Sequence, residues 1–244
     1  MLTTPIRLAV WSGPRNISTA LMRAWENRAD SLVLDEPLYA HFLAVTGIDH
    51  PGRDEVLAVG ETDWHRVVDG LLAPVPGDIG VCYHKQMAHH LTSDMGREWI
   101  GSLTNVLLIR DPCEVVASYI KSRATVTADD IGLPQQVRLY DELSAGGEPP
   151  PVIDAAAFLQ DPETFLRAMC EWVGLPFTDD MLSWRAGPRD SDGVWAPYWY
   201  AAVQRSTGFE PYRHREVHLN KEAAAVAAEC LPYYERLHAV RWTP

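Results

Sequence analysis

The stretch AVWSGPRNISTAL, residues 9–21, constrains the fold more than any other part of the chain. The apolar run 6–11 predicts a short buried strand, and the Ser-Gly-Pro that follows predicts a tight turn. Residues 18–27 then place apolar side chains at helical spacing. A helix that begins directly after such a loop presents unpaired backbone N–H groups and a partial positive charge. The stretch therefore predicts an anion-binding loop.

The side chains of this loop favour a tetrahedral oxyanion. Arg15 offers a bidentate fork of donors, and Ser18 and Thr19 add hydroxyl groups. The G-K-[ST] of an ordinary ATP-binding P-loop is missing from the sequence here. A plain strand–turn–helix, with Ser18 as the N-cap and Arg15 in solvent, remains the alternative.

Predicted strands and helices alternate along the rest of the chain. Strands are expected at residues 6–11, 32–34, 79–83, 105–109 and 152–153. Helices are expected at residues 18–27, 39–45, 65–72, 114–123, 137–143, 162–173 and 222–238. The intervening segments are turn-rich (47–54), polar and histidine-bearing (85–91), a linker (146–151) and aromatic-rich and irregular (183–213). This alternation predicts an α/β fold with a mainly parallel central sheet flanked by helices.

Length and charge narrow the class of protein. The 244 residues suffice for one α/β domain over 1–244, with 183–213 as an irregular segment or lid. A net charge of −12, from 21 basic and 33 acidic residues, argues against a nucleic-acid partner. The four cysteines are scattered and favour neither metal ligation nor disulfides. We expect a cytoplasmic protein without a membrane span, because no targeting segment or long apolar run is present.

A second stretch, LLIRDPCEVVASYIKSR at 107–123, repeats the strand–turn–helix pattern. Arg110 follows the predicted strand, and Ser118 lies on the predicted helix. In open α/β sheets ligands bind outside the carboxyl ends of the strands, so these two side chains are predicted to bind a second anionic group. The alternative is that Asp111 caps the helix and Arg110 pairs with a nearby carboxylate.

Together the two stretches resemble the sulfotransferases that use 3′-phosphoadenosine 5′-phosphosulfate (PAPS). Residues 14–19 match the family pattern P-[KR]-S-G-[TS]-[TS] in register, and Arg110-Asp111-Pro112 with Ser118 matches R-[DN]-P-x5-S. DPETFLRAMCEWVGLPF, residues 161–177, resembles a third family motif, and all three occur in family order. The resemblance implies a three-layer P-loop-like fold. It also implies transfer of a sulfonate group from PAPS to an acceptor, with 3′-phosphoadenosine 5′-phosphate (PAP) as the product.

The resemblance also implies which residues bind the nucleotide. The 5′-phosphosulfate would be held by Arg15, Asn16, Ile17, Ser18 and Thr19. Arg110 and Ser118 would hold the 3′-phosphate. Arg205 is a further candidate for this phosphate, from its place in the aromatic-rich stretch 193–209 rather than from the resemblance. Ile17 stands where the family pattern has glycine, and a β-branched residue with positive φ would be strained. We therefore expect the loop to differ locally, with Asn16 adopting part of the unusual geometry.

The catalytic residues implied by the resemblance are Glu36, Lys85 and Arg15. Glu36 is the expected general base, Lys85 an electrostatic stabiliser, and Arg15 neutralises charge near the leaving phosphate. Three histidines remain alternative bases: His84, His89 and His90. No metal is expected, since a sulfonate carries less negative charge than a phosphoryl group.

The acceptor is expected to be a small molecule, of apolar or aromatic character, bound by the segments 46–63, 125–151 and 183–209. The aromatic residues of 193–209 have the alternative of packing in the core. Two other functions stay open: a P-loop kinase, which would need Mg²⁺ and a Walker lysine, and an inactive nucleotide-binding protein of the same fold. The sequence does not predict the oligomeric state.

Overall fold

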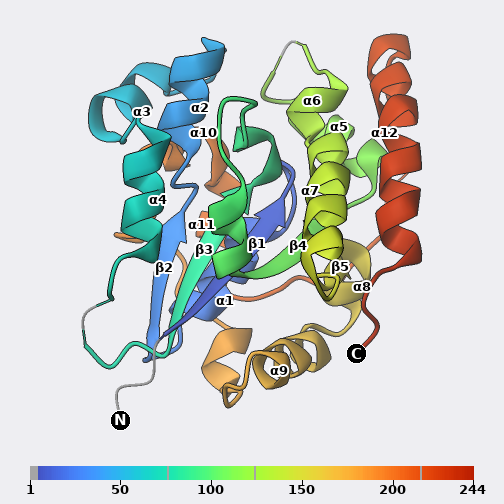
Figure 1. The fold of residues 1–244 in the computed structure, drawn as a ribbon. Helices are drawn as coiled ribbons and strands as arrows, with labels where there is room; N and C mark the ends of the chain where they lie inside the picture. Colours follow the sequence, from blue (N-terminus) through green and yellow to red (C-terminus); the bar gives the residue numbers. More distant parts are fainter. Residues whose placement is uncertain (1–4, 76, 124, 215) are drawn as a thin grey trace.

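The computed structural model describes residues 5–75, 77–123, 125–214 and 216–244. Its core is a five-stranded sheet in the order β2-β3-β1-β4-β5, with every neighbouring pair parallel (Figure 1). The strands are β1 (Ile6–Ser12), β2 (Ser31–Asp35), β3 (Val81–Met87), β4 (Thr104–Ile109) and β5 (Val152–Asp154). The α/β class and the parallel sheet predicted from the sequence are confirmed.

Helices cover both faces of the sheet. The α-helices are α1 (Ser18–Glu26), α2 (Tyr39–Thr46), α3 (Arg53–Val59), α4 (Trp64–Leu72), α5 (Pro112–Tyr119), α6 (Ala128–Ile131), α7 (Leu133–Gly146), α8 (Ala155–Gln160), α9 (Pro162–Trp172), α10 (Ala196–Trp199), α11 (Ala201–Arg205) and α12 (Lys221–Ala239). The described residues also form the short 3₁₀ helices η1 (Ala88–His90), η2 (Glu98–Ser102) and η3 (Asp179–Leu182).

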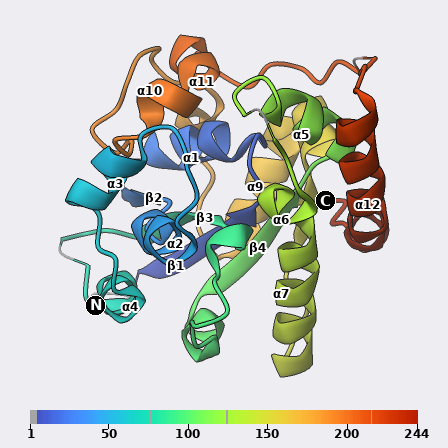
Figure 2. The ribbon, with the colours of Figure 1, turned by 90° about the horizontal axis from the view of Figure 1, so that it is seen from above.

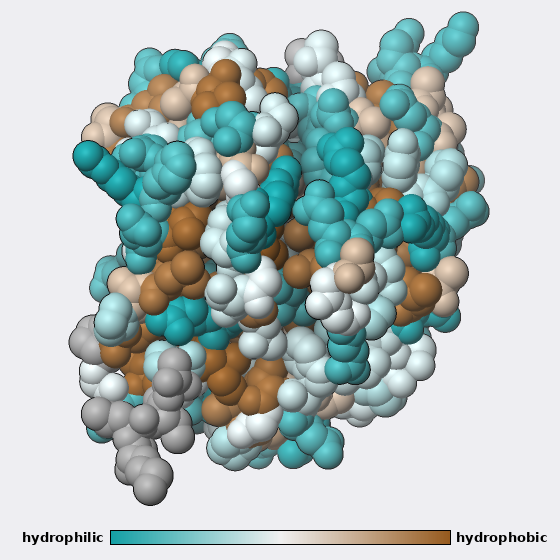
Figure 3. Space-filling view, in the orientation of Figure 1, coloured by the Kyte–Doolittle hydropathy of each residue, from teal (hydrophilic) through white to brown (hydrophobic). Residues whose placement is uncertain are grey.

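Strand β1 shows how the three layers form. Leu8 and Val10 point into a core shared with α1 and α9, whereas Ala9 and Trp11 point into a core shared with α4 and α7. All four side chains are fully buried, as expected for a parallel strand covered on both faces. Seen from above, α1 and α9 lie on one side of the sheet and α4 and α7 on the other (Figure 2). On the side of the molecule that Figure 3 shows, hydrophilic and hydrophobic residues are interspersed.

Three segments differ from the sequence prediction. Strand β3 continues to Met87, so Lys85 lies inside the sheet and only Ala88–His90 form a separate turn. A charged residue is stable inside the sheet at this position because Lys85 forms ion pairs with Asp35 and Glu36. The predicted turn-rich segment 47–54 runs into helix α3, and the irregular segment 183–213 contains α10 and α11.

Gly13 is required by a close backbone approach at the end of β1. A Cβ atom at this position would lie 2.2 Å from the carbonyl oxygen of Ile131 at the end of α6. We predict that Gly13→Ala lowers the free energy of unfolding by about 1–3 kcal/mol, because this contact forces the loop or α6 to move. Denaturant unfolding measures the loss.

Gly70→Ala is the matched control for this prediction. Gly70 lies in α4, and a Cβ there meets nothing within 4 Å. Alanine is the better helix former, so this variant is expected to be as stable as the parent or slightly more stable. Equal stability of the two variants would contradict the importance of the Gly13 contact.

Candidate active site

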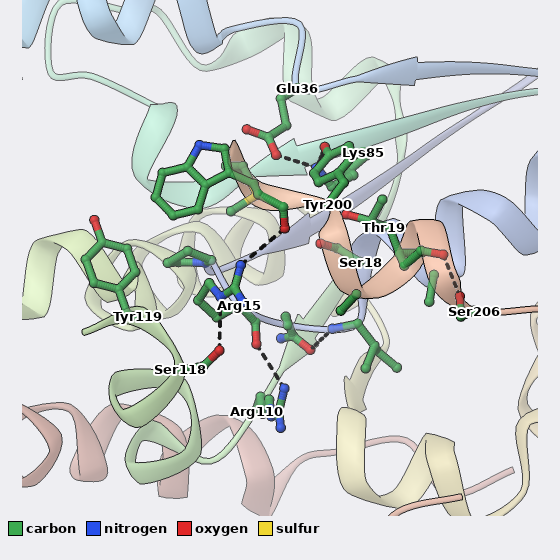
Figure 4. A pocket seen from close by; sticks show the side chains of 18 of the residues that line it. Arg15, Ser18, Thr19, Glu36, Lys85, Arg110, Ser118, Tyr119, Tyr200 and Ser206 are labelled. Carbon is green, nitrogen blue, oxygen red and sulfur yellow. Dashed lines mark hydrogen bonds and ion pairs between the residues drawn. The ribbon is translucent and has the colours of Figure 1, made fainter. Parts of the chain in front are cut away.

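A pocket of about 420 Å³ lies at the carboxyl ends of four strands (Figure 4). Its walls come from the loop after β1, from Glu36 after β2, from the end of β3 with η1, and from Arg110 after β4. The remaining side is formed by α5 and by the aromatic-rich segment around α10 and α11. The charged, polar and aromatic residues that line the pocket, with Ile17 of the loop, include Arg15, Asn16, Ile17, Ser18, Thr19, Glu36, Tyr39, His50, Lys85, His89, His90, Arg110, Ser118, Tyr119, Trp199 and Tyr200.

The loop after β1 takes its unusual backbone conformation at Arg15. Arg15 has φ 55°, whereas Ile17 has φ −87°, which suits a β-branched residue. The expectation that Asn16 would adopt the unusual geometry is wrong, since Arg15 and Glu36 are the non-glycine residues with positive φ in the described chain. Asn16 instead holds the loop: its Nδ2 donates to the carbonyl of Leu108 at 3.0 Å, and its Oδ1 accepts from the Ile17 N–H at 2.8 Å.

Helix α1 begins without a capping side chain. Its N-cap is Ile17, which rules out Ser18 as the cap, and within α1, all of which is described, the first turn carries no acidic residue. Ser18 and Thr19 line the pocket from this first turn. By contrast, Asp111 caps α5 by accepting from the N–H groups of Cys113 and Glu114. The Ile17 N–H donates to Asn16, and the N–H groups of the first turn of α1 face the pocket without a side-chain cap.

The two predicted anion motifs meet in this pocket. Arg15 Nε donates to Ser118 Oγ at 3.0 Å, and Arg110 Nη1 donates to the Arg15 carbonyl at 3.0 Å. Arg15 also donates to the carbonyl of Trp199 at 3.3 Å. Burial, with the nearby charge of Arg110, lowers the pKa of Arg15 from its usual value. An arginine remains protonated under such conditions, so the pocket keeps two guanidinium groups.

The sequence left open whether Arg110 faces a binding site or pairs with a nearby carboxylate, and in the structure it does both. It lines the pocket, and its guanidinium also pairs with Glu114 at 2.8 Å, while Tyr212 donates to the other Glu114 oxygen. Arg205 behaves differently: it is exposed and lies outside the set of described residues that line this pocket. The geometry therefore gives no support to the predicted contact of Arg205 with the 3′-phosphate.

Glu36 and Lys85 form a buried ion pair on the β2–β3 side of the pocket. Lys85 Nζ donates to Glu36 Oε1, to Asp35 Oδ1 at 2.9 Å and to the Tyr200 hydroxyl at 2.7 Å. These three bonds use every donor of the ammonium group. Burial lowers the pKa of Lys85, but Asp35 and Glu36 outweigh burial and raise it above its usual value. In this structure Lys85 therefore remains charged and is directed at carboxylates rather than at the open pocket.

The carboxyl group of Glu36 is tuned toward proton uptake. Burial raises the pKa of Glu36, although the Lys85 charge opposes this effect. Its Oε2 atom lies 4.0 Å from His90 Nε2. A carboxyl group with a raised pKa in a pocket that also contains two guanidinium groups is chemically able to act as a general base.

The three histidines proposed as alternative bases separate in the structure. His84 points away, contacts the Cys82 sulfur at 3.3 Å, and is outside the described lining residues. His89 and His90 line the pocket, with His90 stacked between Tyr39 and Phe42. Burial lowers the pKa of His89 to about 3 and that of His90 well below its usual value, so both are neutral at physiological pH.

Several lining residues are marked by no motif in the sequence. His50, from the turn-rich segment before α3, accepts or donates a hydrogen bond with the Tyr39 hydroxyl at 3.0 Å, and burial lowers its pKa to about 4. Tyr119 and Tyr200 also line the pocket, and no local sequence motif marks either of them. Of the three segments predicted to bind the acceptor, 46–63 and 183–209 contribute lining residues, whereas none of the described residues of 125–151 does so.

We predict that Lys85→Met destabilises the protein by about 3–5 kcal/mol at neutral pH, because it leaves the buried carboxylates uncompensated. The side chains of Lys85 and Asp35 are each only 2% exposed. Chemical denaturation measures the loss, with Lys121→Met, an exposed residue outside the cluster, as the control. A loss equal to that of the control would contradict the importance of the ion pair.

Within the described residues, no group of three histidine, cysteine, aspartate or glutamate side chains is placed to hold a metal ion. None of the described helices is both long and apolar enough to span a membrane.

Comparison with known proteins identifies the family. The family model described as "Sulfotransferase domain" matches residues 6–241. The chain belongs to this family, and its P-loop-like α/β fold is that of sulfotransferases.

Two curated relatives come from Arabidopsis thaliana. "Branched-chain-amino-acid aminotransferase-like protein 1" is 41% identical over 82% of this chain, and "Branched-chain-amino-acid aminotransferase-like protein 2" is 36% identical over 93% of it. The chain spans only 36% and 40% of the lengths of these relatives. Their names therefore describe proteins much longer than the matched region.

Solved structures agree on the fold. The sulfotransferase domain from the curacin biosynthetic pathway has a TM-score of 0.52 at 14% identity, covering 92% of this chain and 97% of that one. The sulfotransferase domain of the Synechococcus PCC 7002 olefin synthase has a TM-score of 0.51 at 14% identity, covering 93% and 95%. At this level of identity the similarity concerns the fold alone.

Proposed function

We propose that this chain is a PAPS-dependent sulfotransferase that transfers a sulfonate group to a hydroxyl or amine of a small-molecule acceptor. The observation that carries the proposal is the convergence of Arg15, Arg110 and Ser118 on one pocket that also contains Glu36. Membership of the sulfotransferase domain family supports sulfonate transfer as the reaction. PAPS as donor rests on the pattern of these residues.

The residues of the pocket fit a nucleotide with two anionic ends. The uncapped terminus of α1, with Arg15, Asn16, Ile17, Ser18 and Thr19, would hold the 5′-phosphosulfate. Arg110 and Ser118 would hold the 3′-phosphate. When bound, PAPS supplies an activated sulfonate, with PAP as the leaving group.

In this proposal Glu36 takes the proton of the acceptor as the acceptor oxygen or nitrogen forms its bond to sulfur. Arg15 neutralises the negative charge that develops on the leaving 5′-phosphate as the old sulfur–oxygen bond breaks. Lys85 supplies a fixed positive charge next to the base. The neutral His50 and His90, with Tyr39, Tyr119 and Trp199, form an uncharged aromatic wall that suits an apolar or aromatic acceptor.

Arg110→Ala tests the assignment of the 3′-phosphate site. We predict that this variant binds PAP about 10- to 100-fold more weakly, because a charge-assisted contact is lost, while its affinity for adenosine 5′-phosphate stays nearly unchanged. Isothermal titration calorimetry measures both affinities. Arg138→Ala, which removes an exposed arginine of α7 outside the pocket, serves as the control. Equal weakening of both nucleotides would contradict the assignment.

A further inference from the structure

A buried polar cluster below Glu36 joins the sheet to the aromatic-rich segment. Asp35 lies at the end of β2, Lys85 in β3, and Tyr200 between α10 and α11. The Asp35 and Lys85 side chains are each 2% exposed, and Tyr200 is 5% exposed. Polar groups this deeply buried are stable only when they form hydrogen bonds, so the positions of these three side chains depend on one another.

The hydroxyl group of Tyr200 is at the centre of this cluster. It accepts from Lys85 Nζ at 2.7 Å and from Trp195 Nε1 at 3.0 Å, and it donates to Asp35, whose two oxygens both lie at 2.8 Å. Asp35 accepts in addition from the Gly193 N–H at 3.1 Å. The segment from Gly193 to Tyr200 is thus anchored to the same carboxylate that binds the lysine.

This arrangement fixes the ammonium group of Lys85 at three points. A lysine has a flexible four-carbon stem, and without Asp35 and Tyr200 its ammonium group could take many positions. With them, Lys85 contacts only one oxygen of Glu36, Oε1. The other oxygen, Oε2, faces His90 at 4.0 Å on the pocket side.

We propose that Asp35 and Tyr200 are positioning residues that hold Lys85 against one oxygen of Glu36 and leave the other oxygen to face the acceptor. The proposal rests on the proposed function, in which Glu36 is the general base. Asp35 lies outside the described lining of the pocket, whereas Tyr200 lines it with its hydroxyl group bonded to Lys85 and Asp35. In this scheme both residues act on the reaction through Lys85 and Glu36.

Asp35 and Tyr200 shift the pKa of Glu36 in opposite directions. A merely structural role would not produce opposite shifts, so the pKa of Glu36 distinguishes the two roles. The groups that face Glu36 are Asp35, Lys85, Tyr200, Tyr39 and His90. After burial, which raises the pKa of Glu36, the charge of Asp35 raises it further, whereas Lys85 and the Tyr200 hydroxyl lower it. Tyr39 and Tyr200 have raised pKa values and His90 a lowered one, so all three are uncharged near neutral pH.

The test measures the pKa of Glu36 directly, by carbon-13 NMR of glutamate labelled at the carboxyl group, in the full chain saturated with PAP. The Glu36 signal is assigned by its loss in Glu36→Gln. We expect Tyr200→Phe to raise the pKa and the isosteric Asp35→Asn to lower it. General loss of structure would move both values in the same direction, toward that of an exposed glutamate.

Turnover provides a second measurement that needs no identified acceptor. With water as acceptor, PAPS is hydrolysed to PAP and sulfate, and sulfate release is followed against pH. We expect Tyr200→Phe to lower kcat about 10-fold or more, because a hydrogen bond to a charged group is lost, and to retain its affinity for PAP. The acid limb, which is the low-pH side of the pH–rate profile, should move to higher pH. Asp35→Asn moves the acid limb to lower pH.

Tyr198→Phe is the matched control. The Tyr198 hydroxyl donates to the exposed Glu55 at 2.8 Å, in the same segment but outside the described pocket lining. This variant is expected to behave as the parent in both measurements. A Tyr200→Phe protein with the parental Glu36 pKa would overturn the proposal whether or not hydrolysis is detectable. If Glu36→Gln hydrolysed PAPS at the rate of the parent protein, Glu36 would not be the general base. The pKa of Glu36 measured by NMR would then still test whether Asp35 and Tyr200 position Lys85.

Discussion

Replacing Glu36 by glutamine is expected to lower sulfonate transfer by about 10²–10⁴-fold, the usual contribution of a general base, with almost no change in PAP affinity. Glutamine has nearly the same size and still accepts a hydrogen bond from Lys85, but it cannot take a proton from the acceptor. Release of PAP from PAPS in the presence of acceptor measures the rate, and calorimetry measures PAP affinity. Glu171→Gln, an exposed position on α9, is the matched control.

The pH dependence of the parent protein follows from the same carboxyl group. A general base acts in its deprotonated form, so activity falls as the pH drops through its pKa. Because burial raises the pKa of Glu36 above its usual value of 4.5, the decline begins at a higher pH than an exposed glutamate would give. Near-normal turnover by Glu36→Gln, with an unchanged acid limb, would mean that another group takes the proton.

Arg15→Ala is expected to lower kcat by about 10²–10³-fold, as the loss of a preorganised transition-state donor does in other enzymes. Arg15 lies between the uncapped terminus of α1 and Ser118, with Arg110 held on its carbonyl, so no other described cation takes its place in the loop. The substitution keeps a non-glycine residue at φ 55° and therefore does not relieve backbone strain.

Arg15→Lys is the companion variant. It retains the positive charge but loses the bidentate fork and the bond to Ser118, so its kcat should lie between the values of the parent and Arg15→Ala. Steady-state kinetics of the three proteins at saturating PAPS decides the point. Equal rates in all three would show that Arg15 has no role in the transfer step.

The extent to which the sequence predicts this site depends on how far apart the partners lie in the chain. Arg15 and Arg110 each follow a strand with a clear local pattern, and parallel topology brings the carboxyl ends of such strands together. Tyr200 donates to Asp35 at the end of β2 and accepts from Lys85 within β3, and its contact with Lys85 spans 115 positions. No local periodicity or motif encodes a contact of that kind.

The loop after β1 illustrates the same limit on a finer scale. The sequence identifies Ile17 as a departure from the family pattern, but the strained conformation lies at Arg15. Hydrogen bonds from Asn16 to the end of β4, and from Arg110 to the Arg15 carbonyl, select this backbone path. These contacts depend on the assembled sheet, so inspection of residues 14–19 alone could not predict them.

The most direct test of the central claim, a site for a nucleotide with two anionic ends, is calorimetric titration of the unmodified protein with PAP and with ATP, each with and without Mg²⁺. The uncapped α1 terminus with Arg15, and the side chains of Arg110 and Ser118 in the same pocket, predict that PAP binds tightly without Mg²⁺ and that ATP binds much more weakly. Tight, Mg²⁺-dependent binding of ATP with no detectable binding of PAP would contradict the proposed function and favour a kinase.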